Sequence, residues 1–257
     1  MKIVFLFTLF VSEMLFAASF KTGLVIPKDW KAHAKFEKVF SGVKLPEKFS
    51  WLEKLPGWTV KNQGQCGSCW AFAQTAILEA AIQLDKELPA PHSLSEQELV
   101  SCDTRSMGCR GGYFTDYQVQ IGQTDEVNYP YVAKNTFCRK DVPHDVKAYE
   151  VAFVGDGNSS PTVEELKTAI MTKGPIAVTV GADSAFMNYR AGTVFGQNGC
   201  RQPGTNHMVV LTGWDDAKNA WQLRNSWGRN WGENGYMWIR YGCNRVAEQA
   251  TFVVYKP

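Results

Sequence analysis

Two cysteines three positions apart, Cys66 and Cys69, lie in a Gly-rich stretch that leads into an apolar, Ala-rich segment. Apolar residues recur at helical spacing over residues 71–84, which predicts a buried helix. Cys69 would then stand at the helix N-terminus, where free backbone N–H groups and the helix dipole favour a thiolate. A thiolate is a nucleophile at neutral pH, but the spacing alone equally allows both cysteines to pair in ordinary disulfides.

The chain has seven cysteines, at positions 66, 69, 102, 109, 138, 200 and 243. Such a number is typical of an oxidising compartment, where thiols pair and stay paired. Because seven is odd, three bridges would leave one thiol free or paired between chains. That remaining thiol is a candidate for chemistry.

Nucleophilic cysteine catalysis also needs a base, and histidine is suited to that task near physiological pH. Among four histidines, His33 lies in the N-terminal segment, and His92 and His144 lie beside prolines in expected surface loops. His207 instead opens an apolar, β-type run over residues 208–211. A strand there would hold its ring at the edge of a sheet, although a buried structural histidine is the alternative.

A catalytic histidine is usually oriented by a third group. Asn225 follows a second β-type run and could accept a hydrogen bond from His207, fixing its tautomer. Trp227 beside it could exclude water and so strengthen that bond. Taken alone, Asn225 would be a turn residue.

Gln-Gly-Gln-Cys-Gly-Ser-Cys-Trp-Ala-Phe at residues 63–72, Asn-His at 206–207 and Asn-Ser-Trp-Gly at 225–228 together resemble the papain family of cysteine peptidases. The resemblance covers roughly residues 45–240. It implies that Cys69 is the nucleophile, His207 the acid and base, and Asn225 the orienting group. Gln63 and the Cys69 backbone N–H would donate to the developing oxyanion.

The sequence Cys-Arg-Gly-Gly-Tyr-Phe at residues 109–114 looks like the family's substrate-strand motif, although an isolated Gly pair is usually a simple turn. Glycines there would let an extended peptide approach the backbone. The resemblance implies an apolar or aromatic preference two positions before the scissile bond. The implied substrate-binding residues are Gly111, Gly112, Tyr113, Phe114, Thr205, Met208 and Trp227.

The resemblance also implies three disulfides, namely Cys66 with Cys109, Cys102 with Cys138 and Cys200 with Cys243. Cys69 is then the odd thiol. Cys243 stands about three residues before the family's usual position, where this chain has Val246. The third pair therefore depends on local geometry.

The pattern of elements predicts the α+β class, with a helical first half and a strand-rich second half. A short helix through Leu99, capped by Ser93 or Ser95, should end before Cys102. A second should cover residues 161–172, with Thr162 and Glu165 as its capping box. The resemblance specifies a papain-like fold with a helical half over about 58–145, an antiparallel β-barrel-like half over about 146–257, and the active-site cleft between them.

The N-terminus predicts a signal peptide over residues 1–18, since a short apolar run is followed by small residues. Residues 19–44 would be a short leader or propeptide with a weak helical pattern over 30–40, and residues 45–257 the peptidase domain. We therefore expect an exported protein, either secreted, periplasmic or in a lysosome-like compartment. Past residue 44 the chain has 20 basic and 22 acidic residues, which offers no general attraction for nucleic acid or an anionic membrane.

The predicted function is thiol-dependent hydrolysis of peptide bonds, most simply as an endopeptidase and without cofactor or metal. Protein or peptide substrates are the expected partners, with a protein inhibitor as a further candidate, and the chain should be a monomer. Alternatives are a catalytically silent peptide-binding scaffold and a peptide ligase of the same fold. Thiol–disulfide exchange would need a bridge between Cys66 and Cys69, and zinc binding would use these two with Cys102 and Cys109.

Overall fold

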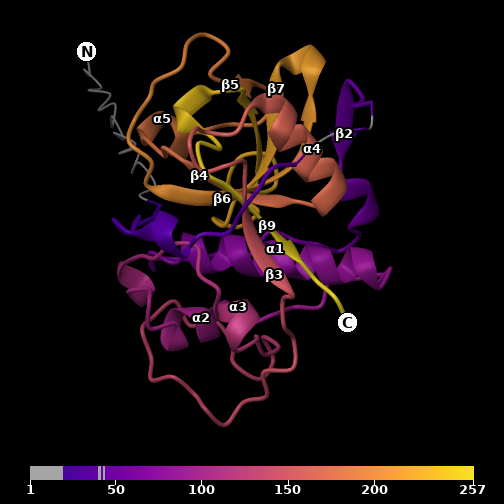
Figure 1. The fold of residues 1–257 in the computed structure, drawn as a ribbon. Coiled ribbons are helices and arrows are strands. Elements are labelled where there is room, and N and C mark those ends of the chain that lie inside the picture. Colours follow the sequence, from indigo (N-terminus) through magenta and orange to yellow (C-terminus); the bar gives the residue numbers. More distant parts are fainter. Residues whose placement is uncertain (1–19, 40–41, 43) are drawn as a thin grey trace, which may run out of the picture.

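The computed structural model describes residues 20–39, 42 and 44–257, so the expected signal peptide lies outside the described residues. Figure 1 shows helices and long loops in the lower part of the molecule and a twisted sheet with helix α4 in the upper part. Helix α1 (Cys69–Asp85) runs along the boundary between them. The catalytic candidates of both halves are therefore brought to one boundary.

The sheet contains nine strands within the described residues, in the order β1-β3-β9-β4-β6-β7-β8-β5, with β2 paired to β6. Its body is antiparallel, as predicted. The strands are β1 Phe36–Glu37, β2 Lys48–Ser50, β3 Glu150–Val154, β4 Ile176–Val180, β5 Val194–Phe195, β6 His207–Asp215, β7 Ala220–Arg224, β8 Tyr236–Arg240 and β9 Ala250–Val254.

The predicted antiparallel β half is present, but its sheet, as far as the structure describes it, does not close into a barrel. A barrel requires its two end strands to pair with each other, but β1 and β5 end the order without pairing within the described residues. Each is two residues long and joins the sheet in parallel, β1 to β3 and β5 to β8. The result is an open sheet of mixed direction at its two edges.

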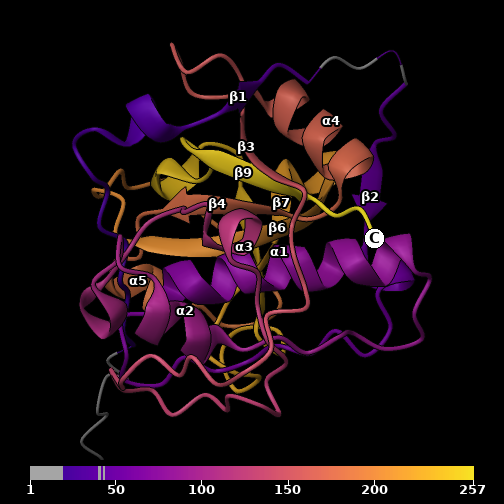
Figure 2. The same cartoon turned by 60° about the horizontal axis from the view of Figure 1, so that its bottom comes forward.

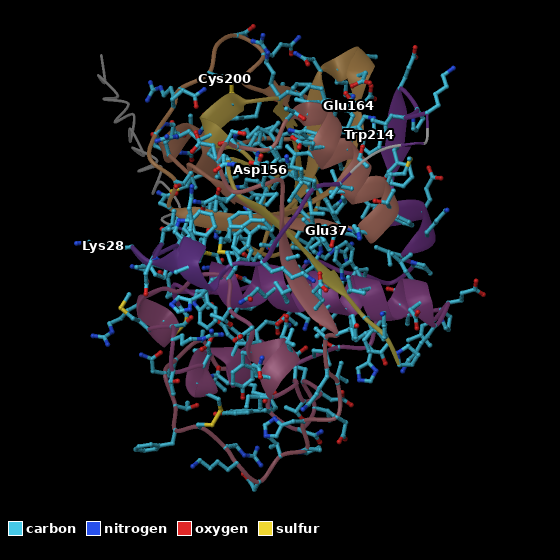
Figure 3. All side chains as sticks on the ribbon, viewed as in Figure 1. Lys28, Glu37, Asp156, Glu164, Cys200 and Trp214 are labelled. Atoms are coloured by element: carbon cyan, nitrogen blue, oxygen red, sulfur yellow. A yellow bond between two sulfur atoms is a disulfide. The ribbon has the colours of Figure 1, made fainter. Side chains whose placement is uncertain are left out.

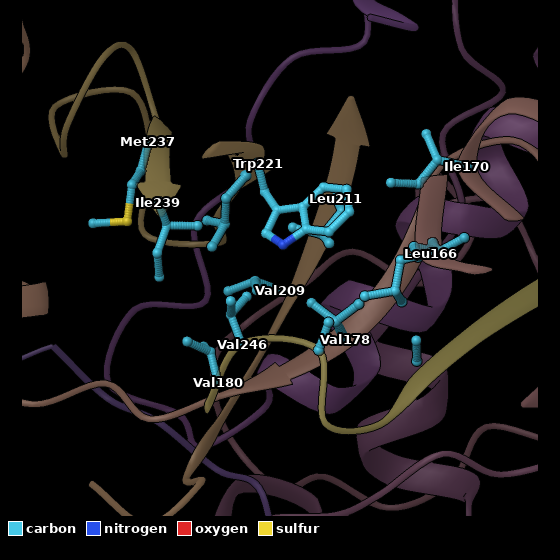
Figure 4. Close-up of a cluster of buried hydrophobic side chains, with 14 of the residues drawn as sticks. Leu166, Ile170, Val178, Val180, Val209, Leu211, Trp221, Met237, Ile239 and Val246 are labelled. Atoms are coloured by element: carbon cyan, nitrogen blue, oxygen red, sulfur yellow. The ribbon is translucent and has the colours of Figure 1, made fainter. Parts of the chain in front are cut away.

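The β half has an apolar core. Every residue of β4 and β6 is buried, which explains their nearly continuous apolar sequences. Figure 4 shows Leu166 and Ile170 of helix α4 pointing toward side chains of these strands, including Val178 and Leu211. Each such side chain contributes about 1.5–3 kcal/mol by leaving water, and this packing fixes β6, the strand that begins at His207.

The remaining helices agree with the sequence in part. The capping box of α4 (Val163–Lys173) is confirmed, since Thr162 Oγ1 accepts from the Glu165 backbone N–H at 3.2 Å and the Glu165 carboxylate accepts from the Thr162 N–H at 2.8 Å. Ser95 caps α2 (Glu96–Cys102), so the expectation that this helix ends before Cys102 is wrong by one residue. The shorter helices are α3 Tyr117–Gln120 and α5 Ser184–Met187, and the 3₁₀ turns are η1 Trp30–His33, η2 Leu52–Lys54, η3 Gly108–Arg110, η4 Asp216–Lys218 and η5 Cys243–Arg245.

The helical half has an apolar core and, in addition, a cluster of buried charged groups. Lys61 Nζ lies 2.9 Å from Glu79, 3.0 Å from Glu96 and 3.1 Å from Glu126, and the first two carboxylates are almost fully buried. Burial raises the pKa of Glu96 to about 8, although Lys61 opposes this shift. The helical half therefore contains a buried charge cluster that joins Lys61 to three glutamates.

Residues 20–39 form a leader that crosses the molecule from the boundary between the halves to the edge of the sheet (Figure 2). The weak helical pattern over residues 30–40 gives only the turn η1, because Phe36 and Glu37 pair with Phe153 and Val154 of β3 instead. Tertiary pairing thus overrides a marginal local preference. None of the helices in the described part of the chain combines the length and apolar composition that a bilayer crossing needs.

Candidate active site

Cys69 is the first residue of α1 and is fully buried. All seven cysteines lie among the described residues, and Cys69 is the one outside a disulfide. The backbone N–H groups of Met208, Trp70 and Cys69 itself act to lower the pKa of its thiol. Because Met208 belongs to β6, the thiol of the helical half lies near the strand that carries His207.

His207, the first residue of β6, has two distinct ring nitrogens. Its Nε2 lies 2.8 Å from Asn225 Oδ1, as a donor–acceptor pair of an oriented imidazole requires. Its Nδ1 is buried and has no hydrogen-bond partner in the described part of the molecule. Trp227 stacks on the ring at a centroid distance of 4.6 Å. The sheet thus presents one oriented imidazole with one nitrogen still available.

Gln63 links the two halves close to Cys69. Its Nε2 donates to Cys66 O at 2.9 Å, and its Oε1 accepts from the Ser226 hydroxyl at 2.6 Å. The Ser226 hydroxyl therefore fixes which end of the carboxamide carries the donors, and the second Nε2 hydrogen remains free. Ser226 lies within the Asn-Ser-Trp-Gly motif, but its part in holding Gln63 depends on contacts across the halves that the motif does not reveal.

Burial decides the protonation of this pair. It raises the pKa of the Cys69 thiol to about 12, against smaller opposing hydrogen bonds from backbone N–H groups. It lowers the pKa of His207 to about 4, with the Asn225 hydrogen bond acting in the other direction. At neutral pH both groups are uncharged here. The predicted thiolate is thus not the favoured form in this structure, because loss of solvation outweighs the helix N-terminus.

The leader covers the pair. The Gly23 and Leu24 N–H groups donate to Asn206 O at 3.2 and 3.1 Å. Gly112 donates to Gly23 O and accepts from the Val25 N–H, both at 2.9 Å, which makes a parallel bridge to Leu24. The predicted Gly pair therefore does receive an extended chain.

Two leader residues show how closely this chain fits. A Cβ atom on Gly23 would lie 2.0 Å from Gly67 O, so only glycine can pass at that point. Phe20 stacks on Trp227 with centroids 4.7 Å apart, and the Trp227 Nε1–H donates to Lys21 O at 2.9 Å. The leader thus follows the cleft from Trp227 to Gly112.

The residues predicted to bind a substrate side chain differ in their burial and in their contacts. Tyr113 is buried, lies 5.1 Å from the Phe114 ring, and donates from its hydroxyl to Gln249 Oε1 at 2.9 Å. Met208 is fully buried, while Thr205 is half-buried and has no side-chain hydrogen bond. Gly111 packs against the leader, because an added Cβ would lie 2.6 Å from a Val25 methyl. The sequence did not predict that the Asn206 carbonyl would bind the leader or that Gln249 would bind Tyr113, because no local sequence pattern indicates either contact.

The structure contains the three disulfides that the family resemblance implies, with Cα–Cα distances of 4.6 Å for Cys66–Cys109, 4.7 Å for Cys102–Cys138 and 5.1 Å for Cys200–Cys243. Cys243 reaches its partner from the η5 turn, where Asn244 adopts a left-handed conformation with φ of 47°. The bridge from Cys66 to Cys109 excludes a Cys66–Cys69 exchange pair. It also removes two of the four thiols that zinc binding would need.

A family model described as "Papain family cysteine protease" matches residues 45–256. The chain belongs to the papain family. It is 36% identical over 208 residues to "Cysteine proteinase 3" of Entamoeba histolytica. That alignment covers 78% of this chain and 65% of the Entamoeba protein. It is 34% identical over 237 residues to "Cathepsin K" of Mus musculus. That alignment covers 88% of this chain and 69% of the mouse protein.

The papain-like fold is shared with solved structures. The digestive procathepsin L2 proteinase from Tenebrio molitor larval midgut superposes with a TM-score of 0.81 at 30% identity, over 91% of this chain and 78% of that one. This papain-family chain spans only 65% of the Entamoeba protein's length. The predicted family and fold are thus confirmed.

Proposed function

We propose that the chain, once its leader has left the cleft, hydrolyses peptide bonds through an acyl-enzyme on Cys69. The observation that carries this proposal is the His207–Asn225 hydrogen bond of 2.8 Å beside a buried, unpaired thiol at a helix N-terminus. This is the arrangement of nucleophile, base and orienting group that acyl transfer requires.

In this mechanism His207 Nδ1 takes the proton of Cys69, and the thiolate sulfur attacks the carbonyl carbon of the substrate. The carbonyl oxygen becomes an anion held by the free Gln63 Nε2–H and the Cys69 backbone N–H. The C–N bond then breaks as His207 returns its proton to the leaving amine. Water, deprotonated by His207, attacks the thioester, and Cys69 recovers its proton as the acid product leaves.

We propose endopeptidase action because the leader already demonstrates room for polypeptide on both sides of Cys69. Phe20 lies against Trp227 at one end, and Trp30 lies 5.6 Å from Tyr113 at the other. A substrate would place an apolar or aromatic side chain, two positions before the scissile bond, against Tyr113, Phe114 and Met208. Its N-terminal flank would then continue toward Trp30, so the leader runs through the cleft in the opposite direction.

The same path makes the leader an inhibitor built into the chain. It buries Cys69 and His207 and holds them uncharged, and a chain of reversed direction does not present its carbonyls as a substrate does. One similar solved structure is a procathepsin, which agrees with a precursor form for this chain too. Removal of the leader in an exported compartment would release the activity.

The test is the intact mass after reaction with an irreversible epoxide probe for activated thiolates, before and after the leader is cut from the folded full chain. One adduct on Cys69, absent in Cys69→Ser and greatly slowed in His207→Ala, is the expected result. The cut enzyme should react about 100-fold faster at pH 7, since exposure to water lowers the thiol pKa. No adduct in correctly bridged, leader-free enzyme would overturn the proposal and favour a peptide-binding scaffold.

A further inference from the structure

The leader holds a second surface outside the cleft. Beyond the active site its strand β1 extends the sheet edge at β3, where the Phe153 and Gly155 N–H groups donate to Lys35 O at 2.7 Å and Glu37 O at 2.9 Å. When the leader leaves, β3 becomes the end strand of the sheet. Its outward N–H groups then lack partners, and an open edge of this kind accepts an extended chain.

Aromatic side chains connect this edge to the cleft without a break. The Phe153 ring lies 6.1 Å from Tyr113 and 5.4 Å from Phe114, the residues proposed to bind the substrate side chain. The leader fills this surface with Trp30, 4.9 Å from Phe153, and with Phe36, 5.5 Å from it. A cavity of about 280 Å³ remains beside Trp30, so the surface has room for aromatic side chains.

Charges flank the same edge. Glu150 pairs with Lys35 of the leader at 2.5 Å, and Asp156 pairs with Lys38 at 3.3 Å. Lys173, the last residue of α4, pairs with Glu37 of the leader at 2.7 Å. Figure 3 labels Glu37, Asp156 and Glu164, the last of which belongs to α4. Departure of the leader would leave two carboxylates beside an aromatic floor.

We propose that the β3 edge, with Phe153, Glu150 and Asp156, is an extended subsite for the N-terminal flank of a protein substrate. The flank would add to β3 as an antiparallel strand, with an aromatic residue over Phe153 and basic residues beside the two carboxylates. The direction of the chain is no obstacle, since the same outward backbone groups of an edge strand serve parallel and antiparallel partners. This inference rests on the proposed peptidase function.

The test compares two fluorogenic peptides with the same residues around the scissile bond. One is short, and the other carries an N-terminal extension with aromatic residues between lysines. The full chain is folded first and then cut by a site-specific protease whose recognition sequence replaces residues 40–44. The extended peptide should have a kcat/KM about tenfold higher, mainly through a lower KM. An extension with alternate N-methylated amides should lose this gain, because it cannot pair with β3.

Charge reversal separates this subsite from the catalytic site. Glu150→Lys with Asp156→Lys should abolish the gain from the basic extension and leave cleavage of the short peptide unchanged. Glu164→Lys, a single charge reversal at an exposed position on α4, is the control for each of the two single variants Glu150→Lys and Asp156→Lys and should keep the gain. The extension peptide alone should also bind the cut Cys69→Ser enzyme in fluorescence anisotropy.

Equal kcat/KM values for both peptides, with the short one cleaved, would overturn the subsite and leave the peptidase proposal intact. Failure to cleave the short peptide would instead contradict the proposed function. In that case the anisotropy measurement still decides the subsite, because absence of binding would overturn it.

Discussion

The two halves that meet at Cys69 and His207 are stabilised by different interactions. Both halves have an apolar core, but the helical half also contains the buried Lys61 charge cluster and two disulfides, whereas the β half has one disulfide. Buried charges must all be paired, because one left alone is costly, while apolar packing tolerates small losses gradually. The nucleophile therefore stands on the half that contains the buried charge cluster, whereas the ion pair between Lys167 and Asp216 in the β half is partly exposed.

The largest effect should follow from breaking the charge cluster. In full chain carrying Cys69→Ser, Lys61→Met leaves Glu79 and Glu96 buried without their cation and should lower the free energy of unfolding by about 3–5 kcal/mol. Urea denaturation measures this, with the exposed Lys134→Met as control. A loss below about 1 kcal/mol would mean that the cluster is no more important than surface ion pairs.

The corresponding change in the β half is Leu211→Ala in β6, which is fully buried. It should cost about 2–5 kcal/mol, because the lost methyl groups leave a cavity between the sheet and α4. The same urea experiment applies, and the exposed Val163→Ala in α4 is the control. If Leu211→Ala and Val163→Ala had the same free energy of unfolding, the rigid packing inferred for β6 would be wrong.

The dependence of unfolding on pH should also distinguish the two halves. Since the folded-state pKa of Glu96 is raised from 4.5 to about 8, its contribution to stability is complete below pH 4.5 and is lost as the pH rises through 8. Glu96→Gln should flatten the pH dependence of unfolding over that interval, whereas Leu211→Ala should leave its slope unchanged. An unchanged slope in Glu96→Gln would assign the titration to another group.

The smallest effect concerns the contact between the halves. Ser226→Ala removes the donor that orients Gln63, and should lower kcat of the leader-free enzyme about tenfold with little change in KM, since the oxyanion is stabilised mainly in the transition state. Unfolding should change by about 1 kcal/mol or less. Gln63→Ala is the comparison and should lose about 100-fold. Equal kcat in Ser226→Ala and wild type would refute a positioning role.

Much of the scaffold follows from local patterns in the sequence. The helical spacing over residues 71–84 lies within α1, and the capping box at Thr162 and Glu165 marks the start of α4 because those contacts span only three residues. The apolar run after His207 gives β6, although the strand continues to Asp215. The chemical motifs named the same side chains that the structure brings together beside Cys69.

The leader could not be predicted in the same way. Its pairing of Phe36 with Phe153 joins residues far apart in sequence, and two residues carry too little pattern to indicate a strand. Burial raises the pKa of Cys69 in this structure, and burial of that residue has no local sequence pattern. The open sheet edges have the same origin, because β1 and β5 are brought in by tertiary contacts.

Trp227 also provides an optical signal. Its indole is held between the Phe20 ring, at an interplanar angle of 10°, and the His207 imidazole, at 20°, and its N–H is bound to Lys21 O. Departure of the leader removes one of these rings and the hydrogen bond together, while a protonated imidazole quenches indole emission. Because the chain has eight other tryptophans, the emission of Trp227 is obtained as the difference between wild type and Trp227→Phe, and it should respond both to the uncovering of the cleft and to the charge of the base.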